Sequence, residues 1–195
     1  TFLNYYYYYY LDLKKKIYII NFHRISNKFN QNLIYTKIHK KKFSSIIEFI
    51  NKKFEILSFD NYSTGNYNFS KKEKIKFIIS FDDGYYDLYQ NAYPYLLKKN
   101  IPAIFFVSTK YIDTNDTIWD QKLCDFIFNL KKNHHKSIKI NNKEYYLNNI
   151  TSLQINEIIH SLKYINDFKR NDILENDLYS KYSYNNFQTK NDRCM

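Results

Sequence analysis

An α/β fold built on parallel strands is predicted by three features of this sequence. Runs rich in β-branched and aromatic residues at 16–20, 74–81 and 103–107 have the length and composition of strands. Segments with apolar residues at helical spacing separate these runs. The connections are short, which favours right-handed crossovers and parallel strands. Residues 54–59 are predicted to be a further strand or extended segment.

The segment 74–81 is the predicted central strand, and its apolar residues should be buried on both faces. These residues are Ile75, Phe77, Ile78, Ile79 and Phe81. Asp82 and Asp83 follow directly, and Gly84 allows the backbone to turn or to approach a ligand closely. Because Asp is a poor strand former, the two carboxylates are expected at the carboxyl end of the strand, where α/β folds bind ligands.

The helices are indicated by apolar periodicity and by their ends. A helix is predicted over 43–53, with Lys at its end to suit the helix dipole, followed by a polar loop over 61–70. The helix after Gly84 should run to 98–100 and be kinked or split at Pro94.

The second half of the chain is predicted to be more helical. Helices are expected over 119–130, from Thr151 onwards with a capping box to Gln154, and over 170–184. Residues 137–147 are predicted to form a small hairpin.

Composition limits the possible classes of protein. The 195 residues suit one domain, and 44% hydrophobic with 20% aromatic residues argues against wholesale disorder. The net charge is +11, but the lysines are scattered in doublets and triplets, and Arg, which reads bases and clamps phosphates, is nearly absent. We therefore interpret the charge as a solvated surface and expect no nucleic-acid partner.

The ends and the cysteines add further expectations. Residues 1–15 are predicted to be a low-complexity Tyr- and Lys-rich N-terminus, and 16–195 one partial domain. Thr1 is not an initiator Met, so the chain is expected to be incomplete at its beginning. No signal peptide is visible, which favours a cytoplasmic location. No apolar run is long enough to cross a membrane. Cys124 and Cys194 match no metal-ligand spacing, and Cys124 is expected in the core.

Two adjacent carboxylates at a strand end allow three interpretations. Asp83 could bind a divalent metal while Asp82 acts as general base on metal-bound water. The pair could instead hold Mg2+ for phosphoryl transfer, with Lys110 as the only candidate partner. In the third interpretation, the carboxylates only cap the following helix.

A longer pattern around these residues resembles a known family. It comprises Ser80–Tyr85, Ala92–Pro94, Pro102–Ser108, Ile19–Ile25 and Trp119–Asp120. Together they resemble the polysaccharide deacetylase family with a NodB-type domain, which is carbohydrate esterase family 4-like, over about residues 16–130. One departure is Ile104, which stands where that family usually has Thr.

The resemblance implies an incomplete distorted (β/α) barrel with a helical insertion. It also implies metal-dependent N-deacetylation of an acetamido sugar within an N-acetylated polysaccharide or glycan. By position, Asp82 would be the catalytic base and Asp83 a ligand of the metal, usually zinc. Two His of a second motif, His-Ser/Thr-x-x-His, would complete the set, because a hydrolytic zinc needs an Asp-His-His set with an open position.

That second motif is missing from this sequence. His160 is followed by Ser, but Tyr164 stands where the second His belongs, in a predicted helix. His134–His135 lies in a Lys-rich turn, and His23 and His39 lack any partner spacing. We therefore expect a chain that stops before the motif, lacks the His that would protonate the leaving amine, and is inactive by itself. A non-catalytic remnant or binding module is the remaining alternative.

Overall fold

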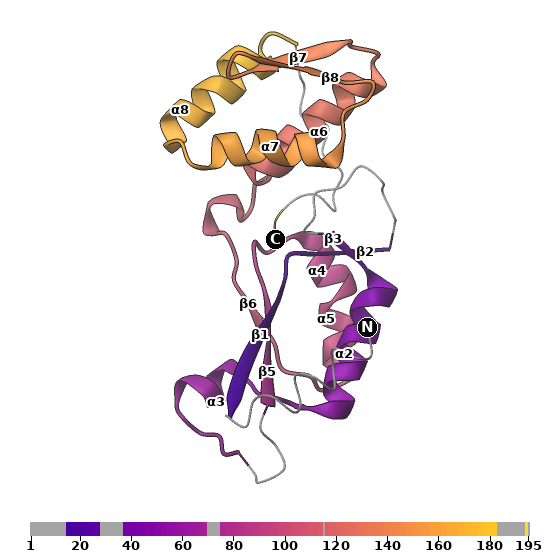
Figure 1. Ribbon diagram of the computed structural model, residues 1–195. Coiled ribbons are helices and arrows are strands. Elements are labelled where there is room, and N and C mark those ends of the chain that lie inside the picture. The colour runs from indigo at the N-terminus through magenta and orange to yellow at the C-terminus, as the bar shows by residue number, and fades with distance from the viewer. Residues whose placement is uncertain (1–14, 28–36, 70–74, 115, 183–193, 195) are drawn as a thin grey trace. The chain divides into compact units, whose positions relative to one another are not determined.

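The structure is a computed structural model that describes five parts of the chain (Figure 1). These are residues 15–27, 37–69, 75–114, 116–182 and 194. The chain forms two compact units, one of residues 1–27 and 38–107, the other of residues 28–37 and 108–195. The predicted α/β class is confirmed. Residues 1–14 of the predicted low-complexity segment lie outside the described residues, as do 183–184 of the last predicted helix.

A parallel sheet forms the centre of the first unit. Its strands are β1 (Lys16–Phe22), β4 (Glu55–Ile56), β5 (Ile75–Phe81) and β6 (Ile104–Phe105). Strand β5 is central: β1 pairs with it along its whole length, and β4 and β6 pair with its beginning and its end. Since β1 and β5 are in parallel register and end at the same level, the residues that follow them come together.

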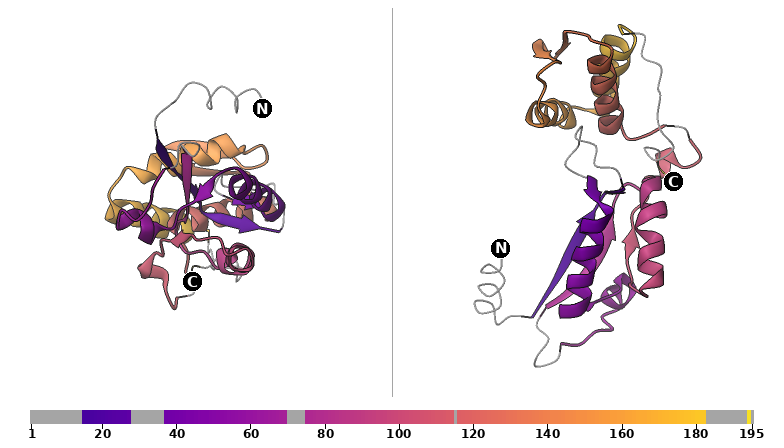
Figure 2. Two further views of the ribbon diagram at one scale, coloured as in Figure 1. Left: turned by 90° about the horizontal axis from the view of Figure 1, so that it is seen from below. Right: turned by 90° about the vertical axis from the view of Figure 1, so that its right-hand side faces the viewer.

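Helices cover the sheet on one side. Helix α2 (Lys40–Lys53) and the consecutive helices α4 (Tyr86–Asn91) and α5 (Tyr93–Lys98) lie on the same side of β1 and β5 (Figures 1 and 2). The predicted split near Pro94 is confirmed, because α5 begins afresh with that proline in its first turn. Helix α2 begins three residues before the predicted start, because His39 acts as its N-cap.

An aromatic cluster joins these helices to the sheet. The ring of Phe43 in α2 lies 5.2 Å from Phe22, 5.9 Å from Phe81 and 5.8 Å from Tyr95 between centroids. Phe81 also stacks on Phe105 of β6 at 4.6 Å. Burial of several aromatic rings around the last residue of β5 fixes the strand end from which the Asp pair starts.

Two local predictions in this unit are corrected in part. The predicted strand or extended segment over 54–59 contains β4 and extended residues at Phe54 and Ser58, but it ends at Ser58. Ser58 caps α3 (Phe59–Ser63), which occupies the start of the predicted loop. In β5, Ile75 and Phe77 are half-buried, whereas the intervening Lys76 is buried. Lys76 tolerates burial because its ammonium pairs with the Glu55 carboxylate.

A second small sheet follows β1. Strands β2 (Arg24–Ser26) and β3 (Lys37–His39) pair with each other. The ring of His39 accepts a hydrogen bond from the backbone N–H of Lys41 at 3.2 Å, so this histidine has a structural role.

The second unit is helical with one hairpin. After the short 3-10 helix η1 (Thr109–Tyr111), it contains α6 (Trp119–Lys132), strands β7 (Ser137–Ile140) and β8 (Lys143–Tyr146), and α7 (Ser152–Lys163). The antiparallel hairpin is confirmed. The capping box is confirmed as well, with the N-cap and N3 side chains bonding reciprocally.

The chain then forms α8 (Asp167–Asp172) and a π-helical segment η2 (Ile173–Tyr179), where one helix over 170–184 was predicted. The core of this unit is apolar and includes Cys124 as predicted. Burial raises the pKa of the Cys124 thiol far above its usual range, so at neutral pH it is an inert core group.

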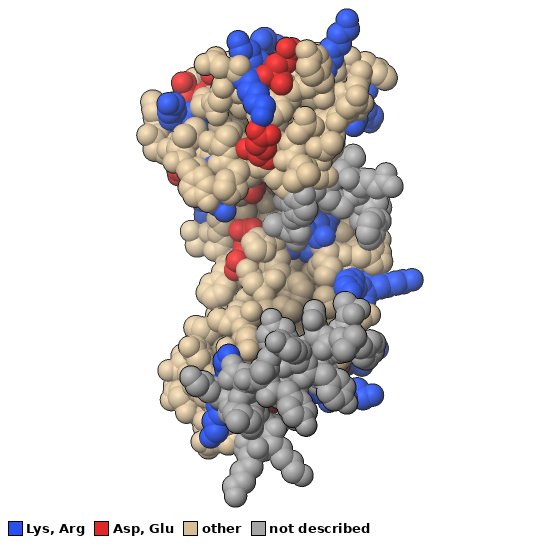
Figure 3. Space-filling view, viewed as in Figure 1, with Lys and Arg blue, Asp and Glu red and all other residues tan. Residues whose placement is uncertain are grey.

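Charged side chains are dispersed on the face drawn in Figure 3, where Lys and Arg stand in small groups with acidic residues between them. Among the described residues, no helix has the length and apolarity needed to span a membrane.

Candidate functional site

The Asp pair lies at the carboxyl end of β5, as predicted. The backbone N–H of Asp82 donates to the carbonyl of Phe22 at 2.9 Å, which extends the β1–β5 ladder by one bond beyond the strand. This bond fixes the backbone of Asp82 beside the residues that follow β1.

A chain of hydrogen bonds orients the Asp82 side chain. Asn21 and Ser80 are partners in the β1–β5 register, and side chains two residues apart on a strand share a face. The Ser80 hydroxyl donates to Asn21 Oδ1 at 2.9 Å, and Asn21 Nδ2 donates to Asp82 Oδ2 at 2.6 Å. The carboxylate therefore receives a strong, charge-assisted hydrogen bond from a side chain that is itself held in place.

His23 faces the same carboxylate oxygen. Its Nε2 lies 3.7 Å from Asp82 Oδ2, and the two side chains are 35% and 37% exposed. The two groups are therefore neighbours at a partly exposed position, at a separation longer than that of a direct hydrogen bond. We expected no functional partner for His23 from the sequence, and this contact is the main correction at the site.

Asp83 and Gly84 form a left-handed turn. Their φ angles are +72° and +67°. A Cβ on Gly84 would lie only 2.8 Å from Val107 Cγ1, so a glycine is required both for the conformation and for the close approach of the chain after β6. Asp83 is half-buried in this turn.

The other four histidines have surroundings of their own. His39 caps α2, and His160 is an exposed residue of α7 whose ring lies 5.0 Å from that of Tyr164. The His135 ring packs 5.4 Å from Tyr182, and His134 is exposed.

A metal fits these residues only in part. Asp83 supplies a suitable oxygen donor, but within the described portion of the chain no three His, Cys, Asp or Glu side chains converge as a metal site would require. The described residues therefore do not form a complete zinc site.

Sequence reasoning found the two carboxylates but missed the side chains that hold them. Asn21, His23 and Ser80 belong to the site through strand register, which pairs residues about 60 positions apart in the chain. The signal available was the polar end of each strand, since parallel strands bring their carboxyl ends to one edge.

The scan against family models matches the chain to "Polysaccharide deacetylase" over residues 70–168, which is half of the chain and includes the Asp pair. The chain belongs to the polysaccharide deacetylase family. The search of curated proteins found no match.

Solved structures of deacetylases are also similar. IcaB from Ammonifex degensii is 19% identical with a TM-score of 0.43, covering 51% of this chain and 41% of that chain. The deacetylase PplD from Streptococcus pyogenes, in complex with acetate, is 22% identical with a TM-score of 0.43, covering 57% and 53%. A polysaccharide deacetylase from Bacillus cereus is 15% identical with a TM-score of 0.42, covering 59% and 37%. The chain thus spans about half or less of these structures.

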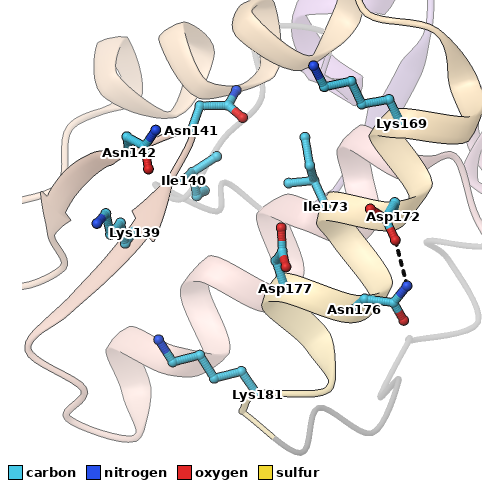
Figure 4. A pocket seen from close by; sticks show the side chains of 10 residues that line it. All are labelled: Lys139, Ile140, Asn141, Asn142, Lys169, Asp172, Ile173, Asn176, Asp177 and Lys181. Atoms are coloured by element: carbon cyan, nitrogen blue, oxygen red, sulfur yellow. Dashed lines mark hydrogen bonds between the residues drawn. The ribbon is translucent and has the colours of Figure 1, made fainter.

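The second unit contains a separate polar pocket of about 680 Å³ (Figure 4). It lies between the β7–β8 turn and the segment from α8 to η2, and Asn176 donates to Asp172 at 2.7 Å on its wall. Its lining residues are Lys139, Ile140, Asn141, Asn142, Lys169, Asp172, Ile173, Asn176, Asp177 and Lys181. Lysines, aspartates and amides alternate around it, so the lining does not select one charge of ligand.

Proposed function

We propose that this polysaccharide deacetylase removes acetyl groups from acetamido sugars of an N-acetylated polysaccharide or glycan. The observation that carries the proposal is the Asp82 carboxylate, which is held by Asn21 at the carboxyl end of β5 and faces His23. This is the position at which α/β folds place their chemistry. We also propose that the sheet of the first unit is part of a distorted (β/α) barrel of the NodB type, with a helical insertion.

In the proposed reaction, Asp82 acts as the general base. A water molecule attacks the acetyl carbonyl carbon, Asp82 takes its proton, and the C–N bond breaks to give acetate and a free amine. The amine must gain a proton as it leaves. We propose that His23, which lies 3.7 Å from Asp82, supplies this proton in place of the histidine of the missing motif. The hydrogen bond from Asn21 keeps Asp82 Oδ2 fixed during this exchange.

Asp83 is proposed as one ligand of a divalent metal, zinc in this family. Such a metal would polarise the acetyl carbonyl and lower the pKa of bound water. Among the described residues no histidines converge with this carboxylate, and one carboxylate by itself binds such an ion weakly. We therefore assign no further step to the metal and propose that this chain on its own does not turn over substrate.

Zinc titration of the purified chain tests this part of the proposal. Calorimetry should show weak binding that Asp83→Ala weakens further, whereas Asp60→Ala, on exposed α3, should leave it unchanged. Tight binding of one zinc per chain would contradict it.

Two other functions remain as alternatives. The first alternative is phosphoryl transfer with Mg2+, which would use Lys110 as a partner of the Asp pair. The Lys110 ammonium lies 5.5 Å from the centroid of the Tyr111 ring. The match to the polysaccharide deacetylase family favours deacetylation over this alternative. A non-catalytic binding module would bind carbohydrate without using the carboxylate. If Asp82→Asn bound an N-acetylated oligosaccharide as tightly as the unchanged chain does, that alternative would be favoured. Under the deacetylase proposal we expect Asp82→Asn to bind this oligosaccharide more weakly.

A further inference from the structure

We propose that Arg24 and Asp87 form a buried clamp that positions His23 against Asp82. The proposal deepens the proposed function and rests on it for its catalytic meaning. Neither residue belongs to the Asp pair, and both act here as positioning residues.

The clamp is a charge pair closed off from solvent. Arg24 Nε donates to Asp87 Oδ2 at 2.9 Å, and the two side chains are 1% and 3% exposed. The backbone N–H of Ile25 donates to the other oxygen, Oδ1, at 3.4 Å. The guanidinium carbon of Arg24 lies 4.5 Å from the centroid of the Tyr85 ring, so the cation also stacks on an aromatic face.

These contacts join the two segments that carry the site. Arg24 opens β2 and directly follows His23, whereas Asp87 lies in the first turn of α4, just after the turn formed by Asp83 and Gly84. A charge-assisted bond between them therefore ties the segment after β1 to the segment after β5. The distance between His23 and Asp82 depends on how these two segments are held.

Asn91 adds a second connection between the same segments. It is a buried residue of α4, and its Nδ2 donates to the Ile25 carbonyl at 2.9 Å. Its Oδ1 accepts from Asn27 Nδ2 at 3.1 Å. Helix α4 thus holds β2 through both a carboxylate and an amide.

A contribution to stability does not by itself explain why a buried ion pair occupies this position. An apolar pair of similar volume is often as stabilising as a buried ion pair, because desolvation offsets the attraction. A planar guanidinium fixes orientation as well as distance, which an apolar contact does not. The location of the pair, one residue from His23, is where such orientation affects the site.

The test measures the contact between His23 and Asp82 by NMR, without zinc or carbohydrate. In the otherwise native chain, Asp82→Asn should change the chemical shifts of the His23 ring, with the His39 ring as an unaffected reference. In Arg24→Lys and in Asp87→Asn backgrounds, this response should fall by about half or more, as in a double-mutant cycle between coupled sites. An unchanged response in both backgrounds would overturn the proposal.

Two further variants separate positioning from general destabilisation. Glu55→Gln breaks the ion pair of buried Lys76 at the other end of β5 and should leave the His23 response intact; its loss there too would overturn the proposal. Arg24→Met with Asp87→Leu keeps an apolar pair in place of the clamp, and it should keep the fold but lose the response. Because no substrate is used, failure of the deacetylase proposal and failure of the clamp give different results.

Discussion

The two ends of β5 bury different kinds of charge. At the amino end, the Lys76 side chain is 1% exposed and its ammonium pairs with Glu55, whose side chain is 41% exposed. At the carboxyl end, Asp82 stays 37% exposed and is surrounded by an amide, a hydroxyl and an imidazole. The charge at the amino end is neutralised by a partner, whereas the carboxylate at the other end stays open to solvent.

This difference matches the different roles of the two strand ends in parallel α/β folds. Ligands bind beyond the carboxyl ends of the strands, and the amino ends contribute to stability. Substitutions at the Lys76 end should therefore change stability alone, and substitutions at the Asp82 end should change binding and chemistry more than stability.

The largest effect on stability is expected at the amino end. Glu55→Gln removes the charge of the carboxylate that pairs with the buried Lys76 ammonium. The free energy of unfolding should fall by about 3 kcal/mol, at the lower end of the range for broken buried pairs because Glu55 is 41% exposed. Urea unfolding measures the change. The matched variant Lys76→Met removes the buried charge itself and should be close to neutral; a loss as large as that of Glu55→Gln would contradict this explanation.

At the carboxyl end, Gly84→Ala should be the most disruptive single change to the turn. The left-handed conformation costs a non-glycine residue about 1–2 kcal/mol, and the new Cβ would also overlap Val107 Cγ1. Thermal and urea unfolding should show this loss. Val107→Ala in the same chain removes the closest contact, to Cγ1, and should relieve part of the overlap but none of the conformational cost. Full recovery of stability would show that φ plays no part.

Asp83→Gly should separate stability from metal binding. Glycine adopts the +72° φ of this position without strain, so stability should stay equal or rise by up to about 1 kcal/mol. Zinc binding should weaken at the same time, because the carboxylate is lost. Asp83→Asn keeps a residue that tolerates this conformation and should weaken zinc binding without the gain in stability. Unchanged zinc binding in both variants would remove Asp83 from the proposed site.

The smallest effect is expected away from both ends, at Tyr95 of α5. Burial and the neighbouring Glu48 carboxylate, to which the hydroxyl donates at 3.2 Å, raise the pKa of Tyr95 to about 12. Because the folded pKa lies above the usual value of 10.0, the protonated phenol stabilises the fold below pH 10, and this contribution disappears as the pH rises to about 12. Tyr95→Phe should flatten this alkaline loss in urea unfolding measured across that range. If the free energy of unfolding fell equally steeply with pH in both proteins, Tyr95 would not be the source of the alkaline loss.

Local patterns predicted much of the fold. The parallel strands, the helix split at Pro94, the hairpin and the capping box at Thr151 all follow from short stretches of sequence. One failure occurred where a distant partner decided the structure, because Lys76 is buried beside Glu55 of the neighbouring strand. The other was a local signal that was missed, since Ser58 ends a short strand by capping the helix that follows it.

The candidate site, like the fold, was predicted where the signal is local and missed where it depends on distant residues. Asp82 and Asp83 could be located because a polar pair after an apolar run is a local signal. The contacts of Asn21 and His23 with Asp82 depend on the register of β1 against β5, which no short stretch encodes. The roles of Asp82 as base and of Asp83 as metal ligand remain predictions.

Shift mapping along β5 tests the central claim most directly. The chain, labelled with 15N, is titrated with an N-acetylated amino-sugar oligosaccharide, and its fully deacetylated form serves as the control. We predict that the amide signals of Asn21, His23 and Asp82 shift, that Lys76 and Glu55 do not, and that the deacetylated oligosaccharide has a weaker effect. Equal shifts at both ends of β5, or shifts confined to the pocket of the second unit, would contradict a deacetylase site at Asp82.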